Sequence, residues 1–277
     1  MMNFSDREQY AGVAAGVPYL LLPPALGRGG APIVIGWHLL DPPRTEAAFA
    51  AALPLDGLDA WRLYLGLPLS GSRKPAGGDA ELMRLGMADA VGNLYRPIQD
   101  QAVAEFEPAL AAVRREHGLT GDRLGLLGGS AGAAVALGVL AETRHPVAAA
   151  VVVSPLVQLR PLVAANARLY GIEYAWTAES ETVADRIDFV RRADELARTG
   201  AAVRLVVGEL DDATAIAEPA ARLRERLAER GSEAELSVVP GMPHALAEPP
   251  GDEPAPQPTH AAAVDRLAVE WFAARLG

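Results

Sequence analysis

The sequence predicts an α/β protein in which helices cover both faces of a doubly wound, mostly parallel sheet. Short apolar runs alternate along the chain with longer segments of helical periodicity. In addition, an apolar run from Leu124 ends in a glycine-rich turn at 128–132, and an alanine-rich segment without a helix breaker follows to Leu140. This is the pattern of strand, tight turn and helix. Such sheets bind ligands at the carboxyl ends of their strands.

The apolar runs and periodic segments give the expected element order. The runs at 19–22 and 32–37 are expected to be neighbouring strands. Residues 68–79 are rich in Gly, Ser and Pro and are expected to form an exposed, mobile loop. The expected strands are 19–22, 32–37, 60–67, the run from 124, 147–153, 203–207 and 235–239; the expected helices are 45–52, 99–117, the segment after Ser130, 185–198, 216–230 and a closing helix through Trp271.

Length and composition limit the class of protein. With 277 residues, 50% of them hydrophobic, we expect one large domain, 1–277, with an insertion at 155–202, which is too long for a single crossover connection. The net charge of −10 and a single lysine, Lys74, leave no basic stripe for nucleic acid. An apolar leader is not visible in the first ten residues, and no run approaches the ~20 apolar residues of a membrane span. We therefore expect a soluble, cytoplasmic protein without a membrane or nucleic-acid partner.

Ser130 is the candidate nucleophile. The absence of cysteine excludes disulfides, zinc-thiolate sites and a cysteine nucleophile, so covalent catalysis must use oxygen. Residues 128–132, Gly-Gly-Ser-Ala-Gly, match G-x-S-x-G, in which small neighbours let serine occupy a sharp strand-to-helix corner. The helix start then offers free N–H groups and a positive dipole end to a developing oxyanion.

A serine nucleophile needs a general base, and His244 is the best placed of the five histidines. It follows the strand expected at 235–239 and so emerges at the same sheet edge as Ser130. His117 and His145 lie where strands begin, and His260 starts the terminal helix. The order serine, acid, histidine also fits this kind of fold.

The acid is expected directly after the strand at 203–207. The segment GELDD presents Glu209, Asp211 and Asp212, any of which could instead cap the following helix. We favour Asp211 as the carboxylate that orients the imidazole, with Asp212 as the alternative.

Two backbone N–H groups are needed to stabilise an oxyanion. One is expected from Ala131, directly after the nucleophile, and the second from Leu39 or Leu40 in the loop after Trp37. His38 is either a side chain of the substrate pocket or a polar residue satisfied at a strand end.

Together these motifs resemble the α/β-hydrolase superfamily, specifically its small bacterial serine esterases and its members similar to prolyl oligopeptidase and dienelactone hydrolase. The resemblance covers nearly the whole chain and rests on GGSAG at Ser130, GELDD at Asp211 and GMPHAL at His244. Two features depart from it. The usual His-Gly of the oxyanion loop is His38-Leu39 here, and the cysteine nucleophile of dienelactone hydrolases is absent.

The resemblance implies that 155–202 is a cap over the active site, an α/β-hydrolase fold with an inserted helical cap. The aromatic residues Tyr170, Tyr174 and Trp176 would then face the substrate, or else pack the small core of the cap itself.

The sequence therefore predicts a serine hydrolase, an esterase that cleaves a carboxylic ester of a small or medium apolar molecule through an acyl-enzyme on Ser130. No metal and no organic cofactor are implied, and a small-molecule ester is the expected partner. Three alternatives stay open: a peptidase or amidase with the same triad, acyl transfer to an alcohol, and a catalytically silent protein that binds a ligand.

Overall fold

The computed structural model describes residues 8–26 and 30–277. The predictions made for residues 1–7, and for residues 27–29 of the loop after the first expected strand, lie outside the described part of the chain.

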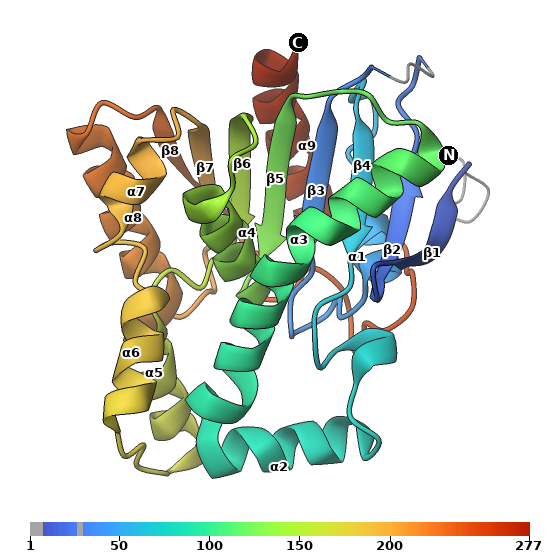
Figure 1. The fold of residues 1–277 in the computed structure, drawn as a ribbon. Helices are drawn as coiled ribbons and strands as arrows, with labels where there is room; N and C mark the ends of the chain where they lie inside the picture. Colours follow the sequence, from blue (N-terminus) through green and yellow to red (C-terminus); the bar gives the residue numbers. More distant parts are fainter. Residues whose placement is uncertain (1–7, 27–29) are drawn as a thin grey trace.

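One eight-stranded sheet organises the molecule (Figure 1). Its order is β1-β2-β4-β3-β5-β6-β7-β8, and β2 runs antiparallel to both of its neighbours while β3 to β8 are parallel. The predicted doubly wound, mostly parallel sheet is confirmed. The strands are β1 Tyr10–Ala14, β2 Val17–Leu22, β3 Ile33–Trp37, β4 Trp61–Leu65, β5 Leu124–Gly129, β6 Val147–Val153, β7 Ala202–Gly208 and β8 Ala234–Val239.

Two details of the N-terminal half of the sheet differ from the prediction. The strands at 19–22 and 32–37 are not neighbours, because β4 pairs with both β2 and β3 and lies between them. The first strand, β1, was not predicted; a two-residue turn with positive φ at Ala15 and Gly16 joins it to β2 as a hairpin. Its sequence YAGVA is apolar, but the run is short, contains a glycine and lies mostly exposed at the edge of the sheet.

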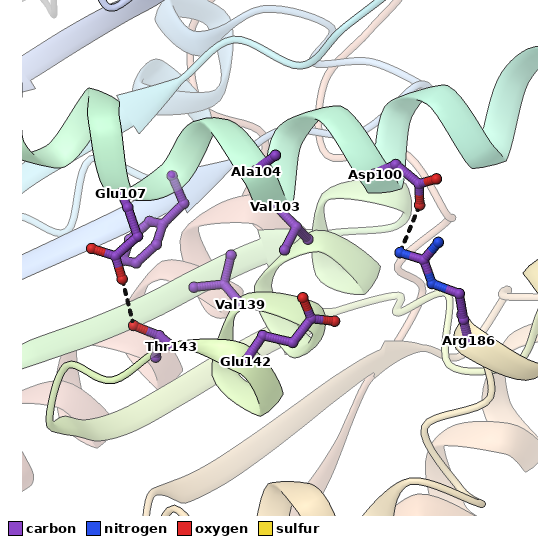
Figure 2. A pocket seen from close by; sticks show the side chains of 9 residues that line it. Asp100, Val103, Ala104, Glu107, Val139, Glu142, Thr143 and Arg186 are labelled. Atoms are coloured by element: carbon purple, nitrogen blue, oxygen red, sulfur yellow. Dashed lines mark hydrogen bonds and ion pairs between the residues drawn. The ribbon is translucent and has the colours of Figure 1, made fainter.

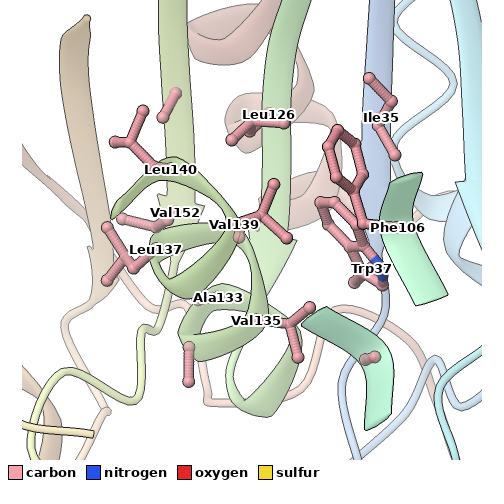
Figure 3. Close-up of a cluster of buried hydrophobic side chains, with 14 of the residues drawn as sticks. Ile35, Trp37, Phe106, Leu126, Ala133, Val135, Leu137, Val139, Leu140 and Val152 are labelled. Carbon is pink, nitrogen blue, oxygen red and sulfur yellow. The ribbon is translucent and has the colours of Figure 1, made fainter. Parts of the chain in front are cut away.

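Helices cover both faces of the sheet (Figure 1). On one face α1 (Glu46–Ala52) and α9 (Thr259–Leu276) bury their apolar sides, and on the other lie α3 (Arg96–His117), α4 (Ala131–Glu142) and α8 (Glu218–Glu229). Figure 3 shows the core on the α3, α4 and α8 face, where the side chains of Trp37, Phe106 and Val139 pack β3, α3 and α4 together. The sheet is therefore buried on both sides, which fixes the positions of its strand ends.

Residues 68–79 are anchored, contrary to the prediction of a mobile loop. Arg73 forms a bidentate ion pair with Glu105 of α3, at 2.6 and 2.9 Å, and Lys74 Nζ lies 2.7 Å from Asp252 Oδ1. A helix that the sequence did not reveal follows, α2 (Gly78–Ala90), which continues through a π-helical turn η3 (Val91–Tyr95) into α3. No residue of α2 is buried, and apolar side chains such as Met83 and Met87 are exposed, so the segment gives only a weak helical pattern.

The insertion between β6 and β7 contains three helices, α5 (Leu159–Tyr170), α6 (Ala178–Arg186) and α7 (Ala193–Ala197). The prediction of a continuous helix at 185–198 is wrong, because the chain turns at Asp188. The Oδ1 atom of Asp188 accepts hydrogen bonds from Gln158 Nε2 at 2.9 Å and from Arg191 N at 3.1 Å. In Figure 1, α2, α5 and α6 lie below the sheet, beyond the end toward which β5 points. They stand next to the strand ends where the site was expected.

Candidate active site

Ser130 occupies a strained corner between β5 and α4. Its φ of 48° and ψ of −114° are unusual for a residue with a side chain, and its N–H donates to Val153 O at 2.9 Å. A Cβ atom added at Gly128 would overlap the backbone of Gly132, and one added at Gly132 would overlap the carbonyls of Trp37 and His38. Both glycines of the G-x-S-x-G pattern are therefore needed for the close packing of β5, α4 and the loop after β3.

A chain of hydrogen bonds joins Ser130, His244 and Asp211. His244 Nε2 lies 2.9 Å from Ser130 Oγ, and His244 Nδ1 lies 2.6 Å from Asp211 Oδ1. Because a carboxylate only accepts, Nδ1 carries the proton and donates to Asp211, which leaves Nε2 to accept from the serine hydroxyl. The three side chains thus stand in the arrangement by which an imidazole removes a hydroxyl proton.

Asp211 is held by two further donors. Its Oδ2 accepts from Ser154 Oγ and from the backbone N–H of Gly208, both at 2.7 Å, and its side chain is fully buried. Ser154 was not predicted as a site residue, although its place directly after the buried strand β6 is the signal that could have found it. These contacts fix which carboxylate oxygen faces His244.

Asp212, the alternative acid, has a different task. Its Oδ1 accepts from the N–H groups of Thr214 and Ala215, at 2.9 and 2.7 Å, and so caps the π-helical turn η4 (Ala213–Ala217). The Ala215 hydrogen bond is the main reason that the pKa of Asp212 is below its ordinary value. Glu209 instead accepts from the N–H of Gly241 at 2.7 Å.

The surroundings of His244 raise its pKa. Burial acts to lower this pKa, but the hydrogen bond and the charge of Asp211 act against it, with a further contribution from Asp41, and the result is a pKa above 6.5. Asp41, in the loop after β3, places its Oδ2 3.8 Å from His244 Nε2. The imidazolium that forms when His244 accepts a proton is therefore stabilised from two sides.

Two of the residues expected to supply backbone donors, Ala131 and Leu40, line the cavity at Ser130. Ala131 is the first residue of α4, so its N–H has no acceptor within the helix. In the loop after β3, the Leu40 side chain lines the cavity at Ser130, whereas Leu39 is fully buried and packs against Gly129. The geometry therefore favours Leu40 over Leu39 beside the nucleophile.

His38 fixes this loop from inside the protein. Its Nε2 lies 3.0 Å from Leu67 N and must accept from that N–H, so Nδ1 carries the proton and donates to Leu39 O at 2.7 Å. Burial lowers the pKa of His38 to about 4, which keeps the ring neutral. Because the Leu39 carbonyl and the Leu40 N–H belong to one trans peptide, this hydrogen bond also directs the Leu40 N–H away from His38.

A cavity of about 380 Å³ opens at Ser130 and His244. Its wall is mostly apolar and comes from the loop after β3, α5 and η4, with polar groups from Tyr95 and Asn166. Burial is the main reason that the pKa of Tyr95 rises to about 12, so its hydroxyl keeps its proton. The lining residues are Leu40, Asp41, Tyr95, Ser130, Ala131, Leu162, Ala165, Asn166, Leu169, Asp212, Ala215, Ile216 and His244.

Four residues expected to line the pocket lie elsewhere. His38 is the buried support described above, and Tyr170 points its ring outward, half exposed. The rings of Tyr174 and Trp176 pack edge to face at 4.9 Å, and the Tyr174 hydroxyl donates to Asp89 Oδ1 at 2.6 Å. These two rings therefore pack against each other, against the end of α2 and against the main core, and do not form a separate core of the insertion.

A second cavity of about 380 Å³ lies between α3, α4 and α6 (Figure 2). Each of its charged side chains has a polar partner: Arg186 Nη2 lies 2.9 Å from Asp100 Oδ1, Thr143 Oγ1 donates to Glu107 Oε1 at 3.1 Å, and Glu142 Oε1 lies 3.4 Å from Arg192 Nη2. None of the triad residues lines it.

Solved structures with this fold include hydrolases of different specificity. An esterase from Pyrococcus furiosus is 14% identical, with a TM-score of 0.61 and 98% and 93% of the two chains covered. A dienelactone hydrolase from Anabaena variabilis is 18% identical, with a TM-score of 0.58 and coverages of 98% and 99%. An acylaminoacyl peptidase from Pyrococcus horikoshii is 12% identical with a TM-score of 0.66; 96% of this chain matches 41% of that one. At these identities the likeness shows the fold alone, that of the α/β hydrolases.

Fold and site together define a serine hydrolase of the esterase or peptidase kind, as the sequence resemblance implied. More narrowly, residues 93–276 match the model of the prolyl oligopeptidase family, and the chain belongs to that family. The matched range contains Ser130, Asp211 and His244. No curated protein sequence matches the chain significantly. Within residues 8–26 and 30–277 no helix is long and apolar enough to cross a membrane, and no cluster of metal-ligating side chains occurs.

Proposed function

We propose that the protein is an esterase that hydrolyses carboxylic esters of small or medium apolar molecules. The observation that carries this proposal is the unbroken chain of hydrogen bonds from Asp211 Oδ1 through His244 to Ser130 Oγ, at 2.6 and 2.9 Å. A cavity of about 380 Å³ with a mostly apolar wall supports a small substrate.

The mechanism follows from the placement of these groups. Ser130 Oγ attacks the ester carbonyl while His244 Nε2 takes its proton, and the oxygen that becomes negative accepts hydrogen bonds from the N–H groups of Ala131 and Leu40. His244 then gives the proton to the leaving alcohol, and an acyl group remains on Ser130. Water activated by the same imidazole releases the acid and restores the serine.

A second candidate function is that of a peptidase or amidase with the same triad, and membership of the prolyl oligopeptidase family favours it.

The proposal includes a cap over the active site formed by residues 155–202, because α5 contributes Leu162, Ala165 and Leu169 to the cavity wall.

The first test is labelling with a fluorophosphonate, followed by intact mass spectrometry. We expect one adduct on the wild-type protein and none on Ser130→Ala, with labelling slowed at least about a thousandfold in His244→Ala, because triad members act as a unit. The half-buried His145→Ala is the matched control and should label like the wild type, since His145 pairs with Glu107 and does not line the cavity.

Matched esters and amides of the same acyl group then separate the two activities. Faster turnover of the esters with no measurable cleavage of the amides supports the esterase, and comparable rates support the peptidase. Failure of the wild type to label would contradict both, and would favour a catalytically silent ligand-binding protein.

A further inference from the structure

Asp41 places a carboxylate beside the atom that passes a proton to the leaving group. Its Oδ2 lies 3.8 Å from His244 Nε2, and it lines the same cavity as Ser130. The backbone fixes this position, because Leu246 N–H, two residues after His244, donates to Pro42 O at 2.9 Å. The loop that carries Asp41 is thus tied to the segment that carries His244, while the Asp41 side chain itself is 56% exposed.

The cavity contains no cation to balance this charge. Its lining within the described chain includes Asp41 and Asp212 but neither lysine nor arginine. The carboxylate of Asp212 is occupied as a cap of η4, and Arg168 lies close enough to lower its pKa. Among the described residues, Asp41 can form an ion pair with His244 alone, and only when that imidazole is protonated.

An uncompensated carboxylate at this place affects the two ends of a substrate differently. The leaving-group atom must come within about 3 Å of His244 Nε2 to receive its proton, so the substituents of that atom lie next to Asp41. A negative charge on the leaving group is repelled there, and so to a smaller extent is the oxyanion. A positive charge on the leaving group changes the repulsion into attraction.

We propose that Asp41 is a specificity-determining residue that selects substrates whose leaving group carries a positively charged nitrogen, such as esters of amino alcohols. This inference rests on the proposed function, since it assumes attack by Ser130 and protonation by His244. It adds a substrate class that the apolar wall alone does not indicate, with the apolar part of the substrate on the acyl side.

Two phosphonate thioesters test the proposal without knowledge of the natural acyl group. Both probes carry the same methylphosphonyl ester group and differ only in the thiol that leaves. One releases thiocholine, which carries a positive charge, and the other releases 3,3-dimethylbutanethiol, which has the same shape but no charge. In each reaction Ser130 Oγ forms a bond to phosphorus, the phosphorus–sulfur bond breaks, the thiol leaves with the electron pair, and the serine proton passes through His244. The rate of the mass adduct on Ser130 gives one second-order rate constant per probe.

For the wild type we expect the cationic probe to react on the order of tenfold faster than the neutral probe at low salt, and the ratio to fall at 1 M salt. Asp41→Asn should reduce the ratio to about one. Glu225→Gln on α8 removes the same charge from an exposed position outside the cavity and should leave the ratio unchanged. Because each ratio is taken within one variant, a general change in the reactivity of Ser130 cancels.

Equal rates of the two probes on the wild type would overturn the role of Asp41 and leave the proposed function intact. So would a preference for the cation that survives in Asp41→Asn. If neither probe nor a fluorophosphonate labels Ser130, the proposed function fails, and this inference fails with it.

Discussion

At the scale of single residues, the adjacent carboxylates of Asp211 and Asp212 have different hydrogen-bond partners. Asp211 is buried and accepts hydrogen bonds from His244, Ser154 and Gly208, whereas Asp212 caps a helical turn. The sequence could narrow the acid to this segment because it follows a buried strand. The sequence could not decide between Asp211 and Asp212, because that choice depends on which of the two side chains points toward His244.

The pH dependence of kcat/KM tests this assignment. His244 must be unprotonated to act as a base and its pKa is raised, so activity should fall as the pH drops through a value above 6.5. In Asp211→Asn the main influence that raises this pKa is gone, while burial and the smaller contribution of Asp41 remain, so the acid limb of the pH profile should move to lower pH. The amide also supports the wrong tautomer, so kcat should fall by about 10⁴-fold.

Asp212→Asn is the matched control, because an asparagine can still cap η4. In this variant the acid limb of the pH profile of kcat/KM should stay above pH 6.5, and kcat should fall by less than about tenfold. A larger loss in Asp212→Asn than in Asp211→Asn would show that the neighbour is the acid.

At the scale of elements, the corner between β5 and α4 depends on the absence of side chains. In Gly132→Ala the new methyl group meets the carbonyls of Trp37 and His38, which belong to a buried strand end and cannot yield. We expect a loss of about 1–3 kcal/mol in the free energy of unfolding, measured by urea denaturation, and a slower labelling of Ser130 as the corner shifts.

Gly86→Ala on α2 provides the comparison. There the nearest atom to an added Cβ is Leu94 Cδ2 at 3.8 Å, so the substitution should stabilise the helix by up to about 1 kcal/mol. If Gly132→Ala were as stable and as reactive as Gly86→Ala, close packing at the corner would not be the reason for the glycine.

The elements that could be predicted are those whose burial leaves a pattern. The strand at 147–153 matches β6 because it is apolar throughout and buried, and α3 ends at His117 as expected, where Gly118 follows with a φ of 66°. In contrast, α2 buries none of its residues, and its apolar side chains form no strong helical face in the sequence. Pocket residues were harder still: α5 and Tyr95 reach Ser130 only through tertiary packing, which a linear pattern does not contain.

At the scale of the whole molecule, the insertion 155–202 is bonded to the rest of the protein at several points. Gln158 links it to α8 through Arg222, at 2.9 Å, and Arg192 Nη2 lies 3.4 Å from Glu142 Oε1 at the end of α4. Its buried residues, among them Phe189 and Leu196, belong to the same core as α4 and β5. The insertion has no separate core, so one cooperative unit is expected despite the length of the chain.

Unfolding in urea tests this expectation, because Trp176 lies in the insertion while Trp37, Trp61 and Trp271 are buried around the sheet. The difference in fluorescence between the wild type and Trp176→Phe reports on the insertion, and far-UV circular dichroism reports on the whole molecule. The substitution replaces a half-buried ring and should change stability by less than about 1.5 kcal/mol. We expect the difference signal and the dichroism to share one midpoint. A difference signal that is lost at lower urea would show that 155–202 opens on its own, as a cap that moves independently of the sheet would.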